Sequence, residues 1–147
     1  MAIANVRGAA PKPLLCAGTP GSGSPSLAVR GRRVLVVDDN RDAAETLADL
    51  VAMLGHVSEV AFDGPSAVER ARASRPDVVL CDIGLPGMDG YAVARALRVE
   101  HGAGIRLIAV SGYAQSEDVR RAREAGFDIH LAKPPDPLDI ARLLEEP

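Results

Sequence analysis

The sequence contains no tryptophan, only two cysteines, and 3% aromatic residues among its 147 positions. Two cysteines exclude a disulfide-stabilised scaffold, so packing must hold the fold together, as in a reduced cytosolic protein. No apolar run approaches the roughly 18 residues that a membrane-spanning helix needs, so we expect no membrane span. The formal net charge of −3 argues against a nucleic-acid-binding surface.

The amino-terminal part of the chain lacks acidic residues altogether. Residues 1–33 contain five basic residues, so the rest of the chain carries 12 basic and 20 acidic residues, a net charge of −8. Residues 1–31 are also rich in Gly, Pro and Ser, and they offer too little apolar surface to offset the entropy of ordering them. We therefore expect a flexible leader or linker over 1–31 and one folded domain over 32–147.

Beyond residue 32, short apolar runs alternate with segments of helical periodicity. Three of the five runs are nearly continuous in Val, Ile and Leu, which is typical of strands buried on both faces of a parallel sheet, and the run at 57–61 is weaker. They lie at 34–37, 57–61, 77–81, 105–110 and 127–131. Each interval has room for one helix and two short loops. The sequence therefore predicts a doubly wound, three-layer α/β domain with a five-stranded parallel sheet.

Helix signals fill the intervals between these runs. Apolar residues recur on one stripe over 41–54, and a second helix is expected over 65–74, where a proline stands in the first turn. Asp89, Ser116 and Asp136 are expected to cap the three remaining helices.

Polar side chains follow the expected strands at their carboxyl ends. Asp38 and Asp39 follow the first strand, Asp82 the third, Ser111 the fourth and Lys133 the fifth. Because these ends meet at one edge of a parallel sheet, where such folds bind ligands, we expect the side chains to converge. Lys133 is one of only two lysines in a chain that otherwise uses arginine, which makes its position conspicuous.

Three converging carboxylates repel one another unless a cation neutralises them. Carboxylate oxygens and water are the ligands that Mg²⁺ prefers, so we expect Mg²⁺ as the cofactor. Asp82 is then a candidate nucleophile toward phosphorus that forms an aspartyl phosphate. Ser111 and Lys133, with backbone N–H groups near residues 83–84 and 112, would neutralise the phosphoryl oxygens.

Four segments of the chain resemble the receiver domain of two-component response regulators. They read VLVVDDN, CDIGLPGMDGY, AVSGY and GFDIHLAKP, at 34–40, 81–91, 109–113 and 126–134. The resemblance extends from about Arg32 to Glu146 and is greatest to receivers of hybrid sensor kinases or single-domain response regulators. It implies a flavodoxin-like sheet with strand order 2-1-3-4-5, and a cis peptide bond before Pro134.

The resemblance also implies a role for each residue at the strand ends. Asp82 would be the phosphoacceptor, and Asp38, Asp39, Asp82 and the backbone carbonyl of Gly84 would hold Mg²⁺. Lys133 would bind the phosphoryl group and Ser111 would be the switching hydroxyl.

The implied donor is a phosphohistidine of a sensor histidine kinase or of a histidine phosphotransfer protein. Phosphorylation would switch the domain between conformations that bind different partners, including an unidentified downstream protein. We expect a cytoplasmic location and no DNA-binding domain in this chain.

Two positions depart from the family pattern. His130 stands three residues before Lys133, where the family usually has a Tyr or Phe that turns inward on phosphorylation. A histidine there can serve as the switch residue, and it would make switching sensitive to pH. Gly84 stands two residues after Asp82, where many receivers have a side chain that shapes the phosphoryl site.

Two other functions compete with a phosphoacceptor domain. A phosphatase or phosphotransferase that forms an aspartyl phosphate has a second Asp two residues after its nucleophile, and Gly84 occupies that position here. We therefore expect no enzyme activity beyond self-phosphorylation and slow self-dephosphorylation. A receiver-like interaction module that signals without phosphorylation is the second alternative, and the complete set of site residues argues against it.

Overall fold

The computed structural model describes residues 31–112 and 115–146, so the expected leader lies outside the described residues except for Gly31. Within these ranges, no helix is both long and apolar enough to cross a membrane. The elements are β1 (Arg33–Val37), α1 (Arg41–Met53), β2 (Val57–Ala61), α2 (Gly64–Ser74), β3 (Val78–Asp82), α3 (Gly90–His101), a short 3₁₀ helix η3 (Gly102–Gly104), β4 (Arg106–Ser111), α4 (Ser116–Ala125), β5 (Ile129–Ala132) and α5 (Pro137–Glu145).

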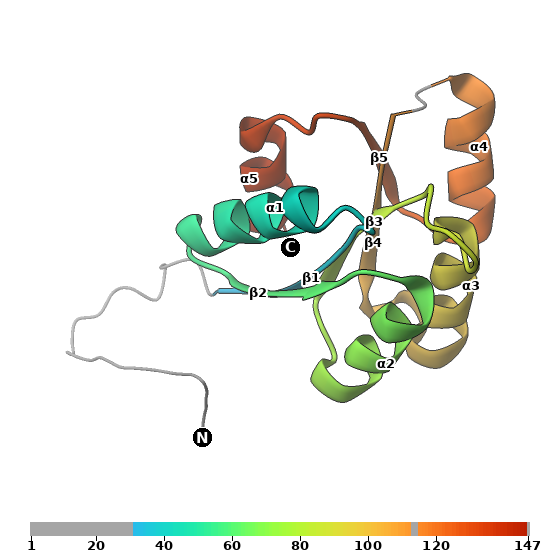
Figure 1. Ribbon diagram of the computed structural model, residues 1–147, viewed down its shortest axis with the longest axis horizontal. Coiled ribbons are helices and arrows are strands. Elements are labelled where there is room, and N and C mark those ends of the chain that lie inside the picture. The colour runs from blue at the N-terminus through green and yellow to red at the C-terminus, as the bar shows by residue number, and fades with distance from the viewer. Residues whose placement is uncertain (1–30, 113–114, 147) are drawn as a thin grey trace. The chain divides into compact units, whose positions relative to one another are not determined.

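The five strands form one parallel sheet in the order β2-β1-β3-β4-β5. Helices α1 and α5 cover one face of the sheet, and α2, α3 and α4 cover the other (Figure 1). The three-layer, doubly wound fold and its strand order 2-1-3-4-5 are thus confirmed. Strand β2 is added on one side of β1, whereas β3, β4 and β5 are added on the other, so the strand order reverses between β1 and β3. Ligand sites of such sheets lie beyond the carboxyl ends of those two strands.

Successive residues of β1 point into different cores. Val34 and Val36 pack with α1 and α5, whereas Leu35 and Val37 pack with α2 and α3. Each of the four is at most 1% exposed, so the strand is apolar at every position rather than at alternate ones. Strand β2 lies at the edge of the sheet and is only half-buried, which explains the weaker apolar pattern of residues 57–61.

Helix starts follow the sequence signals, with one correction. The side chains of Asp89 and Asp136 cap α3 and α5 by accepting hydrogen bonds from backbone N–H groups, as expected. The prediction that Ser116 caps α4 is wrong, because Gln115 is the capping residue and Ser116 is the first residue of the helix. No side chain among the described residues caps α4 through a hydrogen bond. The acidic residues in its first turn stabilise the amino-terminal end of the helix by interacting with the helix dipole.

The strands that carry the polar residues extend further than the apolar runs. Strand β3 includes Asp82 and β4 includes Ser111, so the sheet itself holds both residues. The start of α3 lies tightly against β3: a Cβ atom on Gly90 would stand 2.6 Å from the Asp82 carbonyl oxygen. Leu85 is buried and Met88 packs against the core, so the loop between β3 and α3 is packed inward.

A buried histidine at the end of α1 predicts a pH dependence of stability. His56 is 6% exposed, and its Nδ1 accepts a hydrogen bond from the Arg32 backbone N–H at 3.0 Å. Burial and then the charge of Arg32 lower the pKa of His56, although Glu145 opposes this. The unfolded chain therefore takes up a proton below about pH 6.5 before the folded protein does.

We expect the free energy of unfolding to decrease as the pH falls below about 6.5, until the lowered pKa is reached. The decrease reflects the cost of placing a positive charge on the buried imidazole beside Arg32. Urea denaturation across this range, compared with His56→Gln, measures it. If the free energy of unfolding of His56→Gln depended on pH as it does in the unaltered protein, titrating groups other than His56 would cause the decrease.

Candidate functional site

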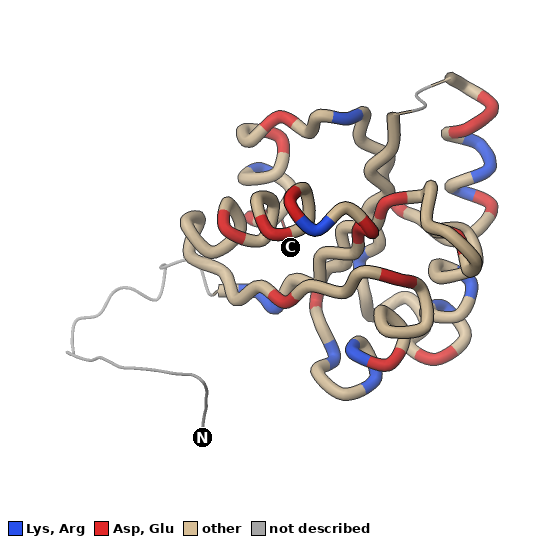
Figure 2. Tube along the Cα trace, in the orientation of Figure 1, with Lys and Arg blue, Asp and Glu red and all other residues tan. Residues whose placement is uncertain are grey.

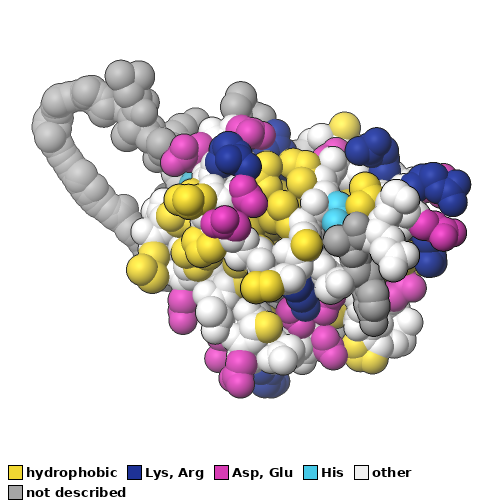
Figure 3. Space-filling view, turned by 90° about the horizontal axis from the view of Figure 1, so that it is seen from above, with side chains coloured by type: hydrophobic (Ala, Val, Ile, Leu, Met, Phe, Trp, Pro, Cys, Tyr) yellow, Lys and Arg dark blue, Asp and Glu magenta, His cyan; other side chains and the backbone are white. Residues whose placement is uncertain are grey.

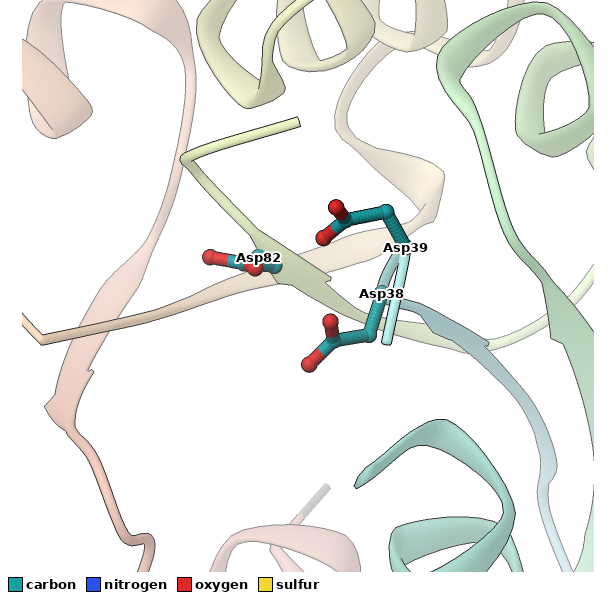
Figure 4. A group of neighbouring side chains, drawn as sticks. All are labelled: Asp38, Asp39 and Asp82. Atoms are coloured by element: carbon teal, nitrogen blue, oxygen red, sulfur yellow. The ribbon is translucent and has the colours of Figure 1, made fainter. Parts of the chain in front are cut away.

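Three carboxylates meet at the carboxyl edge of the sheet. Asp38 and Asp39 directly follow β1, Asp82 ends β3, and these strands are hydrogen-bonded neighbours. One oxygen from each carboxylate lies within 4.8 Å of the other two. Their side chains extend toward the same side of the sheet (Figure 4). The structure therefore brings together the acidic residues that the strand ends predicted.

Lys133 forms ion pairs with two of these carboxylates. Its Nζ lies 3.1 Å from Asp38 Oδ2 and 3.1 Å from Asp82 Oδ2. Partial burial lowers the pKa of Lys133, but the hydrogen bonds and charges of Asp38 and Asp82 outweigh it, so the net shift is upward. The ammonium is therefore charged at neutral pH. The peptide bond between Lys133 and Pro134 is cis, as the family resemblance implied.

Backbone N–H groups orient the two carboxylates that Lys133 contacts. Asp38 Oδ1 accepts from the Asn40 N–H at 2.9 Å, and Asp82 Oδ1 accepts from the Gly84 N–H at 3.1 Å. The Asn40 side chain in turn caps α1 by accepting from the Ala43 N–H. Asp38 and Asp82 are therefore each held by a backbone N–H group and by Lys133.

The charge of the cluster suits a divalent cation. Three carboxylates against one ammonium leave an excess of negative charge, and Asp38 is only 7% exposed. More acidic residues lie along α1 and the neighbouring loops (Figure 2). The donor atoms are all oxygens, which fit Mg²⁺ better than a softer metal. The residues present thus fit the predicted cofactor, and the Gly84 carbonyl as a further ligand remains a prediction.

Ser111 lies at the adjoining strand end. It is 1% exposed, pairs with Ala132 of β5, and its carbonyl accepts the Lys133 backbone N–H at 2.9 Å. In β4 it follows Val110, the partner of Asp82 across the sheet. The backbone therefore places Ser111 between Asp82 and Lys133, and the role of its hydroxyl remains a prediction.

His130 lies apart from the acidic cluster. It is half-buried in β5, pairs with Ala109, and adjoins a small space that Val119, Ala122 and Arg123 of α4 line. Its Nε2 is buried and has no hydrogen-bond partner among the residues that the structure describes. This environment leaves the ring without a polar anchor on that side, and the switching role of His130 remains a prediction.

A pocket of about 730 Å³ opens beside the cluster, between α1 and the loop that precedes α5. Asp38 and Lys133 line its inner end, and its walls are mostly apolar. The apolar lining residues are Ala43, Leu47, Leu50, Val110, Pro134, Pro135 and Pro137. Figure 3 shows hydrophobic side chains gathered on this side of the molecule, with acidic side chains among them. Sequence reasoning missed the pocket, although the proline run at 134–137 marks one wall.

Sequence reasoning also missed a stacked cation at the start of α1. Arg41 is the first residue of α1, and its guanidinium carbon lies 4.2 Å from the centre of the Phe62 ring. Phe62 directly follows Ala61, whose carbonyl accepts the Asp38 backbone N–H at 3.1 Å. The stacked pair therefore stands on the two segments that flank Asp38. No local pattern in the sequence joins residues 41 and 62.

Comparison with known proteins gives matches over the same region. Residues 34–145 match the family model of the response regulator receiver domain. The chain is 39% identical over 107 residues to the gliding motility regulatory protein of Myxococcus xanthus, covering 72% of this chain and 14% of that one. It is 36% identical over 109 residues to the DNA-binding response regulator MtrA of Mycobacterium tuberculosis, covering 74% of this chain and 47% of MtrA. The chain therefore spans less than half of either relative.

A solved structure agrees with these matches. The receiver domain of the sensor histidine kinase PA1611 from Pseudomonas aeruginosa is 32% identical and superposes with a TM-score of 0.71. The match covers 78% of this chain and 95% of that domain, whose structure has a magnesium ion coordinated in its active-site cleft. Fold and sequence similarity thus extend over nearly the whole of that domain.

Proposed function

Because the chain belongs to the response regulator receiver family, a family of two-component signalling, we propose that Asp82 is its phosphoacceptor. The observation that carries the proposal is the position of Lys133 Nζ, 3.1 Å from both Asp82 Oδ2 and Asp38 Oδ2. A fixed cation beside a nucleophilic carboxylate and further metal-binding carboxylates is what transfer of a phosphoryl group requires.

The reaction needs a donor with a good leaving group. An Asp82 oxygen attacks phosphorus, the bond from phosphorus to the donor's imidazole nitrogen breaks, and the electron pair leaves with the imidazole. Lys133 already contacts Asp82 and is placed to bind one of the phosphoryl oxygens. The Gly84 N–H, which now donates to Asp82, and the Ser111 hydroxyl are proposed to bind the others.

Asp38, Asp39, Asp82 and the Gly84 carbonyl are proposed to hold Mg²⁺. When bound, the ion would neutralise charge that builds up on the transferring phosphoryl group. The chain's own contribution is to hold the carboxylates together: Asn40 and Gly84 orient Asp38 and Asp82 through their backbone N–H groups.

We propose that Ser111, Lys133 and His130 carry the conformational switch. New charge on Asp82 would draw Lys133 and the Ser111 hydroxyl toward the phosphoryl group. Movement of β4 would vacate space that the His130 ring, unanchored at Nε2, can enter. A shift from about 1% to about 99% of the active form requires about 5.5 kcal/mol of differential stabilisation. Charge-assisted hydrogen bonds of about 1.5–3 kcal/mol each supply much of it.

A sensor histidine kinase or a histidine phosphotransfer protein is the proposed partner. A protein that delivers its phosphohistidine to Asp82 must contact the surface around the site. The apolar pocket between α1 and the loop before α5 adjoins Lys133 and suits the apolar face of a partner helix.

We propose a cytoplasmic location, since the kinase's phosphoryl donor ATP is found there. We also propose that the receiver domain spans residues 32–147 and follows a leader or linker over 1–31.

The competing enzymatic function is tested by assay with a chromogenic phosphate monoester and Mg²⁺. We expect no turnover, because Gly84 stands where an aspartyl phosphatase needs an acid to protonate the leaving group. Incubation with acetyl phosphate, whose leaving group needs no such acid, should instead add one phosphoryl group to the protein. Sustained monoester hydrolysis would favour the phosphatase, and a protein that accepts no phosphoryl group would contradict the proposal.

A further inference from the structure

The acidic site must receive a phosphodonor that is itself negatively charged. Three carboxylates lie within 4.8 Å of one another, and Lys133 is the one cationic side chain hydrogen-bonded to them among the described residues. Like charges in such a cleft slow the approach of an anion, whereas a cation at its rim speeds it. A positively charged side chain beside the cluster therefore matters for the donor's arrival, apart from any role in the reaction itself.

Arg41 is close to the cluster along the backbone. It follows Asp39 by two residues, and its guanidinium stacks on the ring of Phe62, 4.2 Å from the ring centre. Stacking of this kind is worth about 0.5–1 kcal/mol at an exposed site, enough to restrict a long side chain. Phe62 follows Ala61, whose carbonyl accepts the Asp38 N–H, so the backbone that carries the ring is tied to the backbone of Asp38.

The Arg41 guanidinium contacts an aromatic ring but forms no ion pair with a carboxylate among the described residues. No carboxylate among them lies within ion-pairing distance of its guanidinium, whereas Arg72 and Arg98 have close carboxylate partners. A cation in the first turn of a helix is also disfavoured by the helix dipole. The helix dipole therefore gives no reason for a cation at this position, and the charge is available to an anionic ligand at the neighbouring site.

We propose that Arg41, positioned by Phe62, attracts the dianionic phosphoryl donor to the acidic site and raises the rate at which the site is labelled. The inference rests on the proposed function and adds to it a residue that recognises the donor's charge. The charge of Arg41 acts with opposite sign on the two ligands of the site: it favours the phosphoryl donor and disfavours Mg²⁺.

The test compares the unaltered protein with Arg41→Ala, Arg41→Lys and Arg95→Ala. Arg95 is an exposed residue of α3, so its loss changes the net charge equally without altering the rim of the site. The first measurement is the second-order rate of labelling by acetyl phosphate at saturating Mg²⁺. The second is the dissociation constant for Mg²⁺ alone, and both are repeated at low and high salt.

For Arg41→Ala at low salt, we expect labelling to slow by about threefold or more and Mg²⁺ to bind about threefold more tightly. Both differences should shrink at high salt, because ions screen the exposed charge. Arg41→Lys should retain most of the labelling rate, and Arg95→Ala should match the unaltered protein. Structural damage would instead weaken labelling and Mg²⁺ binding together.

Equal labelling rates for Arg41→Ala and the unaltered protein at low salt would overturn this inference and leave the proposed function standing. A parallel loss of labelling and Mg²⁺ affinity would overturn it as well, since it would indicate damage rather than lost attraction. Failure of the unaltered protein to be labelled would overturn the proposed function, and with it the inference.

Discussion

Asp82→Asn is expected to abolish labelling of the protein by acetyl phosphate and Mg²⁺, with a rate reduced by about 10⁴-fold or more. The substitution removes the nucleophilic oxygen but keeps the size of the side chain and an acceptor for the Gly84 N–H. Asp82 also lies at the end of a sheet strand whose register with β4 is set by backbone hydrogen bonds, so the fold is expected to survive. Intact-protein mass spectrometry measures the added phosphoryl group.

Asp42→Asn is the matched control for this experiment. Asp42 is an exposed residue in the first turn of α1 and lines the pocket, but it is not part of the acidic cluster. Its variant should be labelled within about threefold of the rate of the unaltered protein, the scale expected for the loss of one exposed charge near the site. Unchanged labelling of Asp82→Asn would refute the assignment of Asp82 as the phosphoacceptor, whatever the control shows.

Lys133→Ala is expected to separate acceptance of the phosphoryl group from the switch. The variant loses the ammonium that lies 3.1 Å from Asp82 Oδ2, so we expect it to accept phosphate about 10²-fold more slowly. Once phosphorylated, it lacks the charge-assisted hydrogen bond that draws β5 toward the phosphoryl group. Hydrogen exchange of β4, α4 and β5, measured before and after labelling, reports whether the domain switches.

The unaltered protein should show altered exchange in these elements after labelling, and Lys133→Ala should show little change at equal labelling. Arg142→Ala is a suitable control because Arg142 pairs with Asp139 on the exposed side of α5. A phosphorylated Lys133→Ala protein with the exchange pattern of the phosphorylated unaltered protein would contradict a role for Lys133 in switching.

Much of the fold follows from local patterns. Strands such as Val34–Val37 are apolar at every position because both faces of the sheet are covered, so their burial could be predicted from the sequence. The helix caps at Asp89 and Asp136 also follow from local chemistry. At Ser116 the local pattern placed the cap one residue too late, because both Gln115 and Ser116 adjoin the helix start and propensity alone does not separate them.

Some residues of the site could likewise be predicted from the sequence, and others could not. Asp38, Asp39, Asp82 and Lys133 could be predicted because the carboxyl ends of parallel strands necessarily meet at one edge. The stacking of Arg41 could not, because it depends on how α1 and the segment after β2 approach each other in space. The same holds for the pocket beside Lys133, whose walls come from distant parts of the chain.

The central claim is that the clustered carboxylates make a Mg²⁺ site, and calorimetric titration of the folded protein with MgCl₂ tests it most directly. We expect one ion to bind, and Asp39→Asn to weaken binding by at least about tenfold while Asp42→Asn weakens it by no more than about threefold. Circular dichroism under the same conditions establishes that each protein is folded. Absence of Mg²⁺ binding by the folded, unaltered protein would contradict the account.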